Sequence, residues 1–485
     1  MGALDRLMAR LGYVKPQRRS FAAAGGGNLV GNWSTADLHI NQSLYRSLRT
    51  LRARSRDLAR NNDYARQFLR MVRTNVVGPS GFGLQVHARM VDGRLDDAGS
   101  SRCEAAFAKW SRREHCDHVG RLSWTEFQQL WIETIARDGE VLVRRIRGHG
   151  EFGYRLQLID PALLDETHND DLPGGARIRM GVEIDRDGRP LAYHLLTSDS
   201  ADPRRVSANT RQYVRVLAAD IWHDYLVEQA GQLRGVPWMS STLIRQKRLG
   251  SFEDAAVAAA EEGAKKLAWL KTPHGDLAPL ADNGGDQQPT TGTLYSESGD
   301  GVHYAGLPPG YELQAWDPKY PDQSFGDFVK ATLRGIAAGL GVAYHNLAND
   351  LEGVNYSSSR AGILEEREVW KTLQVWMIDR LCARVYSEWL PFAILSGQIE
   401  TSIDLVHKWD HAVWQGRRWT WVDPLKDVNA SILAIQNGLT SRTRVIRDMG
   451  HDPEEIWAEL ERERVHLATV LAQAPQAVAE DDDDE

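Results

Sequence analysis

The sequence predicts an α+β protein, and three observations support this fold class. The first half of the chain combines amphipathic helices with short strands joined by glycine-containing turns. The second half is mainly helical and is interrupted by one stretch rich in Gly, Pro, Asp and Thr at 272–318. Hydrophobic residues make up 42% of the 485 residues and charged residues 26%, which is enough apolar material for a sizeable core.

Residues 1–40 and the helix that follows them are expected to behave differently. The first segment mixes basic residues with a run of small residues at 22–27, which cannot bury enough apolar surface to become ordered, so we expect a mobile N-terminal arm. From 44 to 77, apolar residues such as Leu48 and Phe68 are spaced for one helical face, with arginines on the other. Gly78 and the proline after it are expected to end this helix.

A capping box marks the start of the next helix, because Ser123 and Glu126 can each bond an exposed backbone amide of the other. A turn at Gly139 is expected to end it. Four strands are then predicted, the last two joined by a turn at 185–188; they cover 140–146, 154–159, 178–184 and 191–196.

The second half is expected to begin with two helices that flank a small β-rich insertion. Ser251 is expected to open a helix crowded with alanines, whose small side chains let helices approach closely. The other helix is expected to start near Ser324 and to close at Gly341. Between them, brief β-like pieces such as 311–316 indicate the insertion.

The remaining chain is expected to be loop and helix. A polar loop is predicted over 342–357, followed by a long amphipathic helix from about 358 to 390 that Pro391 stops. Four tryptophans are interpreted as core packing rather than as a binding surface: Trp409, Trp414, Trp419 and Trp421. Helices are expected near 428–437, near 440–449 and from Pro453, and the six acids at 480–485 are expected to be solvated.

Composition excludes several classes of protein. No run of about 18 uncharged apolar residues occurs, so neither a membrane-spanning helix nor a membrane partner is expected. The N-terminus lacks the features of a secretory signal, and three cysteines are too few for a disulfide framework: Cys103, Cys116 and Cys382. The net charge of −8 argues against a protein whose main task is to grip nucleic acid.

The candidate catalytic features are weak. Four possible metal ligands stand in a row at 115–118, but contiguous ligands need a tight turn to meet at one ion, so a polar surface loop is favoured over a metal site. Glycine-rich residues 25–28 lack a preceding strand and a following Gly-Lys-Ser/Thr, so no nucleotide site is expected. Glu365 and Glu366 are interpreted as a solvated helix start, although they could be imagined as paired carboxylates with Asp350 and Glu352. Neither catalytic residues nor a cofactor are expected.

Six short segments, in order along the chain, resemble the lambda-type family of phage portal proteins. They are RDGEV at 137–141, LQLIDP at 156–161, GQLRGVPW at 231–238, LRGIAAGLG at 333–341, NYSSSR at 355–360 and VDPLKD at 422–427. The order helix, β-rich insertion, helix, polar loop and long helix, which was read from the residues themselves, is the order that this resemblance requires.

The resemblance implies a portal fold with named parts. These are an N-terminal arm (1–40), a mixed α/β wing (41–238), stem helix 1 (239–269), a clip (270–318), stem helix 2 (319–341), a tunnel loop (342–357), a long helix with the second part of the wing (358–424), a helical crown (425–472) and a disordered acidic tail (473–485).

The family also implies a function and partners. The chain would form a dodecameric ring at one capsid vertex, and its channel would pass double-stranded DNA during packaging and ejection. Terminase, the major capsid protein and neck or tail proteins would be its partners, in the host cytoplasm during assembly and then in the virion. A neck or tail adaptor ring, and a metal-dependent hydrolase at 115–118, remain alternatives.

Two sets of residues are the candidate functional positions. The tunnel-loop candidates are Tyr344, His345, Asn346, Asn349, Asp350, Asn355 and Tyr356. The amides of the three asparagines could touch phosphates by neutral hydrogen bonds, and the two tyrosines could pack at subunit contacts. An ordinary loop between two helices is the alternative. The stem candidates are Ala256, Ala259, Lys330 and Arg334.

Overall fold

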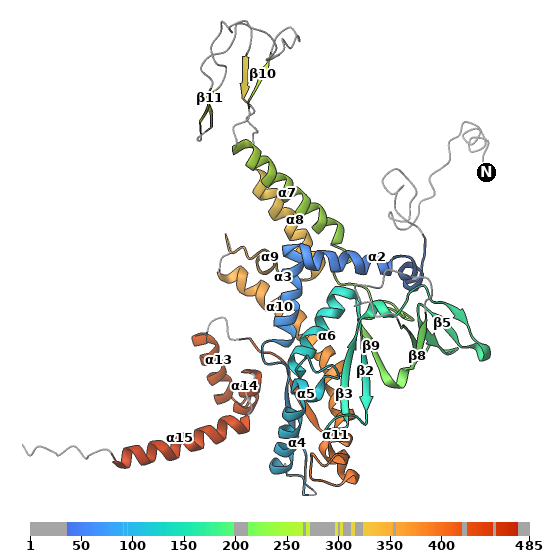
Figure 1. Cartoon of the computed structure of the whole chain (residues 1–485). Coiled ribbons are helices and arrows are strands. Elements are labelled where there is room, and N and C mark those ends of the chain that lie inside the picture. The colour runs from blue at the N-terminus through green and yellow to red at the C-terminus, as the bar shows by residue number, and fades with distance from the viewer. Residues whose placement is uncertain are drawn as a thin grey trace, which may run out of the picture.

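The computed structural model describes residues 36–473, except 91, 95, 198–211, 265–267, 272–295, 299–300, 304–311, 316–323, 353–355, 420–423 and 450–452. The expectations for the N-terminal arm up to residue 35 and for the acidic tail from 474 lie outside the described residues. In the described part, the chain forms a mixed α/β body, a projecting helix pair and a C-terminal group of helices (Figure 1).

The expectation of a single helix over 44–77 is wrong. The structure has α2 (Ile40–Asn61), α3 (Asp63–Val72) and a π-helical turn (Arg73–Val77). Asn62 adopts an extended conformation, and its side chain accepts a hydrogen bond of 2.9 Å from the backbone N–H of Ala65. Asparagine is a favoured N-cap residue, so the chain turns here and starts a second helix in a different direction (Figure 1). Gly78 ends the segment as predicted, with φ +78°.

The capping box is confirmed at the start of α6 (Trp124–Asp138), which follows α4 (Asp97–Trp110) and α5 (Arg113–Cys116). Gly139 closes α6 with φ +93°. A Cβ atom on Gly139 would lie 2.5 Å from the carbonyl carbon of Val236, so this position needs glycine for both its conformation and its space.

Two antiparallel sheets follow. One has the order β3-β2-β9, from β2 (Glu140–Arg147), β3 (Tyr154–Ile159) and β9 (Ile221–Tyr225). The other runs in chain order through β4 (Asp170–Asp171), β5 (Arg177–Arg179), β6 (Val182–Ile184), β7 (Pro190–Leu196) and β8 (Tyr213–Leu217). The one strand expected over 178–184 is therefore wrong, because a tight turn at Met180 (φ +50°) and Gly181 (φ +81°) splits it into a hairpin. Short 3-10 helices connect the strands at Pro161–Leu163, Pro173–Gly175 and Ala218–Asp220.

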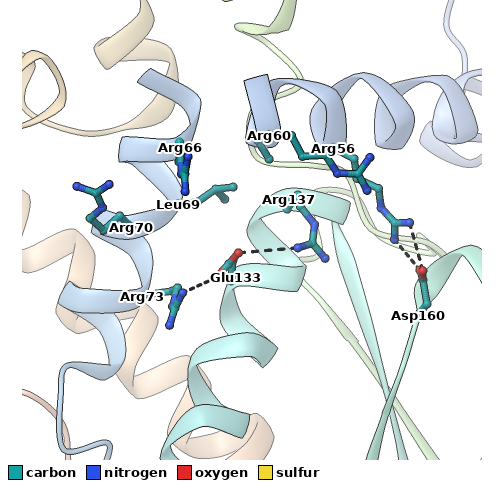
Figure 2. A pocket seen from close by; sticks show the side chains of 10 residues that line it. Arg56, Arg60, Arg66, Leu69, Arg70, Arg73, Glu133, Arg137 and Asp160 are labelled. Atoms are coloured by element: carbon teal, nitrogen blue, oxygen red, sulfur yellow. Dashed lines mark hydrogen bonds and ion pairs between the residues drawn. The ribbon is translucent and has the colours of Figure 1, made fainter. Parts of the chain in front are cut away.

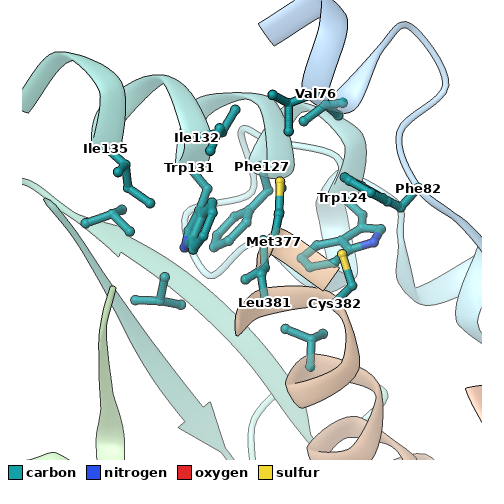
Figure 3. Close-up of a cluster of buried hydrophobic side chains, with 14 of the residues drawn as sticks. Val76, Phe82, Trp124, Phe127, Trp131, Ile132, Ile135, Met377, Leu381 and Cys382 are labelled. Atoms are coloured by element: carbon teal, nitrogen blue, oxygen red, sulfur yellow. The ribbon is translucent and has the colours of Figure 1, made fainter. Parts of the chain in front are cut away.

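The main core combines residues from the first and the second half of the chain. Phe127, Trp131 and Ile135 on α6 point at Met377 and Leu381 from the second half (Figure 3). Strand β1 (Gly83–Val86) likewise pairs with β14 (Ala412–Gln415). The core role expected of the tryptophans is confirmed for Trp409 and Trp414, which are buried; Trp419 is partly buried against the core, and Trp421 lies outside the described residues.

The long helix is longer than expected. It consists of α10 (Tyr356–Met377), a π-helical turn (Ile378–Cys382) and α11 (Ala383–Leu395), so Pro391 lies inside the helix and does not stop it. Proline in a helix interior costs about 3 kcal/mol. Burial of Trp389, Leu390, Ala393 and Ile394 on both sides of Pro391 offsets that cost. A 3-10 turn (Ile403–Leu405) and α12 (Val406–Trp409) follow.

Two helices project from the body as an antiparallel pair (Figure 1), α7 (Leu243–Ala264) and α8 (Ser324–Leu340). The start of α8 is as predicted, but Ser251 does not open α7. It lies eight residues after the first residue of α7, Leu243, and its hydroxyl donates to the carbonyl of Lys247 at 3.0 Å. At the far end, β10 (Ala268–Lys271) pairs with β13 (Glu312–Ala315) and β11 (Ser296–Ser298) pairs with β12 (Gly301–His303).

The C-terminal helices lead away from the body (Figure 1), and they are α13 (Pro424–Gln436), α14 (Arg442–Met449) and α15 (Pro453–Gln473). Their positions agree with those expected from the sequence. Among the helices of the described chain, none combines the length and the apolar character needed to cross a bilayer.

Candidate functional site

The segment after α8 is more ordered than a polar loop. Gly341 (φ +70°) ends α8, and the short helix α9 (Tyr344–Ala348) begins three residues later. Val342 and Leu347 are buried in the main core. The expectation of a loop free between two anchors is therefore wrong for its first half, because apolar side chains at two positions hold it against the body.

Two side chains of α8, Lys330 and Arg334, contact this segment. The guanidinium of Arg334 lies 5.4 Å from the ring centroid of Tyr344, and the Tyr344 hydroxyl donates to Asp350 Oδ2 at 2.7 Å. That hydrogen bond lowers the pKa of Asp350 from its usual value. Lys330 Nζ forms an ion pair with Glu352 at 2.8 Å. Lys330 and Arg334 thus position the loop in addition to lying on the helix pair.

Asn346 does not have a free amide, contrary to its expected role at phosphates. Its side-chain amide donates to the carboxylate of Glu366 on α10, and its backbone carbonyl accepts a hydrogen bond of 3.2 Å from Gln67 on α3. Glu366 is buried, which raises the pKa of its carboxyl group, so its interpretation as a solvated helix start is wrong. His345 is partly buried nearby.

In the described part of the segment, the exposed residues after α9 begin at its C-cap. Asn349 closes α9 with φ +52°, and both it and Glu352 are exposed. Leu351 between them is 71% exposed. Asn355 and the side chain of Tyr356 lie outside the described residues. The structure therefore pairs Tyr344 with Asp350 and Asn346 with Glu366, and leaves Asn349 exposed.

Fewer alanines of α7 are buried in the helix pair than its alanine-rich sequence suggests. Ala256 is buried and Ala259 is partly buried, whereas Ala258 is exposed. Two glycines of α8 allow the close approach at the base of the pair. A Cβ atom on Gly335 would clash with Nη1 of Arg245, and one on Gly339 would lie 2.5 Å from Cγ2 of Thr242, the residue before α7. Alanines were expected to provide this close packing, and the glycines were missed.

The row of possible ligands at 115–118 has a structural role. The buried carboxylate of Asp117 accepts hydrogen bonds from the backbone N–H groups of Val119, Arg121 and Leu122. Burial raises the pKa of Cys116 to about 12, so this thiol stays protonated near neutral pH. A surface loop was expected, but two of the four residues are buried in the fold. Within the described residues, no three potential ligands cluster in a way that could hold a metal ion.

A buried ionic network joins two of the segments that carry the family resemblance. Arg234 donates to Glu140 through Nε at 2.8 Å and Nη2 at 2.5 Å, and His223 Nε2 lies 3.0 Å from the same carboxylate. Arg234 also donates to the carbonyl of Met180 at 2.6 Å. Burial alone would raise the pKa of Glu140, but Arg234 and His223 hold it well below its usual value. Nothing in the periodicity of the sequence indicated this pairing.

Comparison with known proteins decides the family. A family model described as phage portal protein, lambda family, matches residues 26–374, which is well over half of the chain. The chain belongs to this family. Portal proteins of this family are structural, non-enzymatic components of the virion.

Curated relatives agree along almost the whole chain. A probable portal protein of Halomonas phage phiHAP-1 is 34% identical, with 96% of this chain and 92% of the relative covered. The portal protein of Escherichia phage N15 is 25% identical (93% and 91%), and portal protein B of Escherichia phage lambda is 24% identical (91% and 88%).

Among solved structures, chains from the necks of gene transfer agent particles are similar. One from an empty particle has 13% identity and a TM-score of 0.43, with 84% of this chain and 94% of that chain covered. One from a native particle has 14% identity and a TM-score of 0.44, with 82% and 94% covered.

Proposed function

We propose that this portal protein assembles as a dodecameric ring at one capsid vertex and that duplex DNA passes through its channel during packaging and ejection. The observation that carries the proposal is the helix pair α7–α8, which projects from the body and bears small β sheets at its far end. In a single subunit the helix pair has no neighbours, whereas a closed ring would place twelve copies of the helix pair around one axis.

The parts of the fold fit the portal layout. In this proposal α7 and α8 are the stem within 239–269 and 319–341, and the sheets between them form the clip at 270–318. The body supplies the wing from 41–238 and 358–424, and α13 to α15 form the crown at 425–472.

Each part would meet a different partner. The clip would face terminase during packaging and neck or tail proteins afterwards, and the wing would meet the major capsid protein. No nucleotide site is expected from the sequence. Because packaging requires ATP hydrolysis, the packaging motor would be a separate protein. A neck or tail adaptor ring agrees less well with this fold, because the chain has the projecting helix pair and the C-terminal helices in addition to the body.

The tunnel loop would be the segment from Asn349 to Tyr356, since the part before it is packed against the body. Its amides would contact DNA by neutral hydrogen bonds, which give weak and sequence-independent contacts. Twelve copies around the axis would multiply these contacts without the salt-dependent affinity that lysines or arginines add.

Negative-stain electron microscopy of the purified full-length chain tests the proposal. Rings with a central hole are expected. Monomers or solid particles at micromolar concentration, in low and in moderate salt, would contradict it. A second measurement, packaging of DNA into capsids assembled with and without the protein, distinguishes a portal from an adaptor ring.

A further inference from the structure

A cleft between α2, α3 and α6 gathers positive charge that the fold does not neutralise. It has a volume of about 550 Å³, and its lining includes six arginines against two carboxylates. The arginines, shown in Figure 2, are Arg56, Arg60, Arg66, Arg70, Arg73 and Arg137.

Half of these arginines already have partners in the chain. Arg56 donates to Asp160 at 2.5 Å, and Arg73 and Arg137 both lie within 4 Å of Glu133, at 3.3 Å and 3.8 Å (Figure 2). These pairs use both carboxylates that line the cleft, Glu133 and Asp160.

The other three arginines form no ion pair with any described residue. Arg60 lies at the end of α2, and Arg66 and Arg70 lie on α3; all three are exposed. The break at Asn62 sets the two helices at an angle and so brings arginines of both to one cleft. A cleft with unpaired guanidinium groups on its walls fits carboxylate side chains, which arginine binds through two parallel hydrogen bonds.

Charge is unevenly distributed along the chain. The segment Ile40–Val77 has nine arginines and two aspartates, whereas the rest of the chain has 49 basic and 64 acidic residues. One copy therefore has a basic segment and an excess of acidic residues elsewhere in the sequence, which can supply carboxylates to the basic segment of another copy. In a cyclic ring, two different surfaces of the same subunit meet at every interface, and opposite charge on them makes the contact complementary.

Neighbouring surfaces extend this basic region toward the helix pair. On the other side of α2, Arg54, Lys247 and Arg248 line a second cleft of about 480 Å³ together with Ile244 of α7. The Ile244 side chain is largely exposed. Basic and apolar groups side by side are typical of a surface that another protein covers.

We infer that the arginine cleft is completed by carboxylate side chains of a second copy of this chain, so that neighbouring subunits in the ring are held by arginine–carboxylate pairs at Arg60, Arg66 and Arg70. This inference rests on the proposed ring. The apolar side chains beside the basic ones favour a protein surface over duplex DNA, whose binding is an outcome of the tests below.

The first experiment compares charge reversals. The variant R60E/R66E is expected to give about tenfold fewer subunits in rings than wild type at low salt, a change typical of lost charge complementarity. The control R112E/R121E removes the same charge at two exposed arginines outside the cleft and is expected to assemble normally. Circular dichroism melting verifies that both variants fold.

The second experiment identifies the partner. The variant R60K/R66K keeps the charge and adds amines, which a carbodiimide couples to touching carboxylates. Rings assembled from a mixture of isotopically labelled and unlabelled copies are expected to give cross-links that join the two kinds of chain, and mass spectrometry locates the acidic residues.

The outcomes are separable. If wild type forms rings and R60E/R66E forms them equally well, or if the cross-links stay within one chain, the inference is wrong while the ring proposal stands. Protection of the introduced amines by a duplex oligonucleotide, and not by assembly, would assign the cleft to nucleic acid and overturn the inference. A wild-type chain that forms no ring would remove the proposed function, and this inference with it.

Discussion

In the body, the side chains of Trp110, Trp131 and Trp389 are completely covered by the chain's own residues. In the projecting helix pair, Ile244, Val257 and Phe328 are 64%, 68% and 54% exposed. The core of the body is covered by the chain's own residues, whereas the helix pair leaves large apolar side chains exposed on the single copy. A neighbouring copy in an assembly could cover such a surface.

The largest expected effect lies in the body. Replacing Arg234 by Ala leaves the carboxylate of Glu140 buried with a weakened set of partners, and breaking a buried pair in this way costs about 3–5 kcal/mol. We expect the free energy of unfolding, measured by urea denaturation, to fall by that amount. A control at an exposed arginine of the same region, R186A, should change it by less than about 0.5 kcal/mol. Equal losses for both variants would contradict the role of the network.

The same network gives a pH dependence. The pKa of Glu140 is lower in the folded chain than in the unfolded chain, so its contribution to stability is present above the unfolded value near 4.5 and is lost as the pH falls through the folded value. We expect the urea midpoint to decrease below pH 4.5 in wild type. The decrease should be smaller in the variant E140Q, whose side chain does not titrate. An identical acid profile for both proteins would be evidence against the assignment.

The second prediction compares overpacking on the inner face of the helix pair with the same substitution on its outer face. Replacing Ala256 by Leu overpacks a buried position and should cost about 1–3 kcal/mol, with a lower melting temperature and fewer rings. The matched change A258L, at an exposed position of the same helix, should not lower the melting temperature. The change at Ala259, which is partly buried, should fall between them.

The third effect tests whether the exposed apolar groups serve assembly. Changing Val257 and Phe328 to Ser should alter the unfolding free energy of the isolated subunit by less than about 1 kcal/mol, since little buried surface is lost. Ring yield in electron micrographs should nevertheless fall. Unchanged ring yield would show that these side chains face solvent in the assembly, and the comparison between body and arm would lose its functional meaning.

The smallest effect on stability is expected at the tip of the loop. Changing Asn349 and Asn355 to Lys should leave rings intact and slow the passage of DNA. DNA affinity should also depend more steeply on salt, because each lysine that reaches the duplex adds about one phosphate contact. Packaging rate and filter binding at several salt concentrations measure this. The change N349Q/N355Q is the control and should behave as wild type.

A deletion sharpens the same point. Removing 347–354 would also remove Leu347, which is buried in the core, so a loss of packaging after that deletion would not be specific to the loop. Removing 351–354 spares the core contact. We expect rings with impaired packaging or retention of DNA, and normal packaging by this variant would show that the tip is only a connector.

The sequence by itself determined the α+β class, the order of the main helices and the family. Periodicity and end signals located α6 with its capping box, the hairpin β2–β3, the start of α8 and the C-terminal helices, because these features depend on residues close together in the chain. Six short segments in order were sufficient to indicate the family that residues 26–374 match.

Only the tertiary structure decided how distant segments are used. Pro391 stays inside a helix because its neighbours are buried, and Asn346 binds Glu366, a partner twenty residues away. The network of Glu140 with Arg234 and the charged cleft between α2, α3 and α6 likewise combine side chains far apart in sequence. The physical reason is common to all of them: burial and pairing free energies depend on which groups the fold brings into contact, and no local pattern records that.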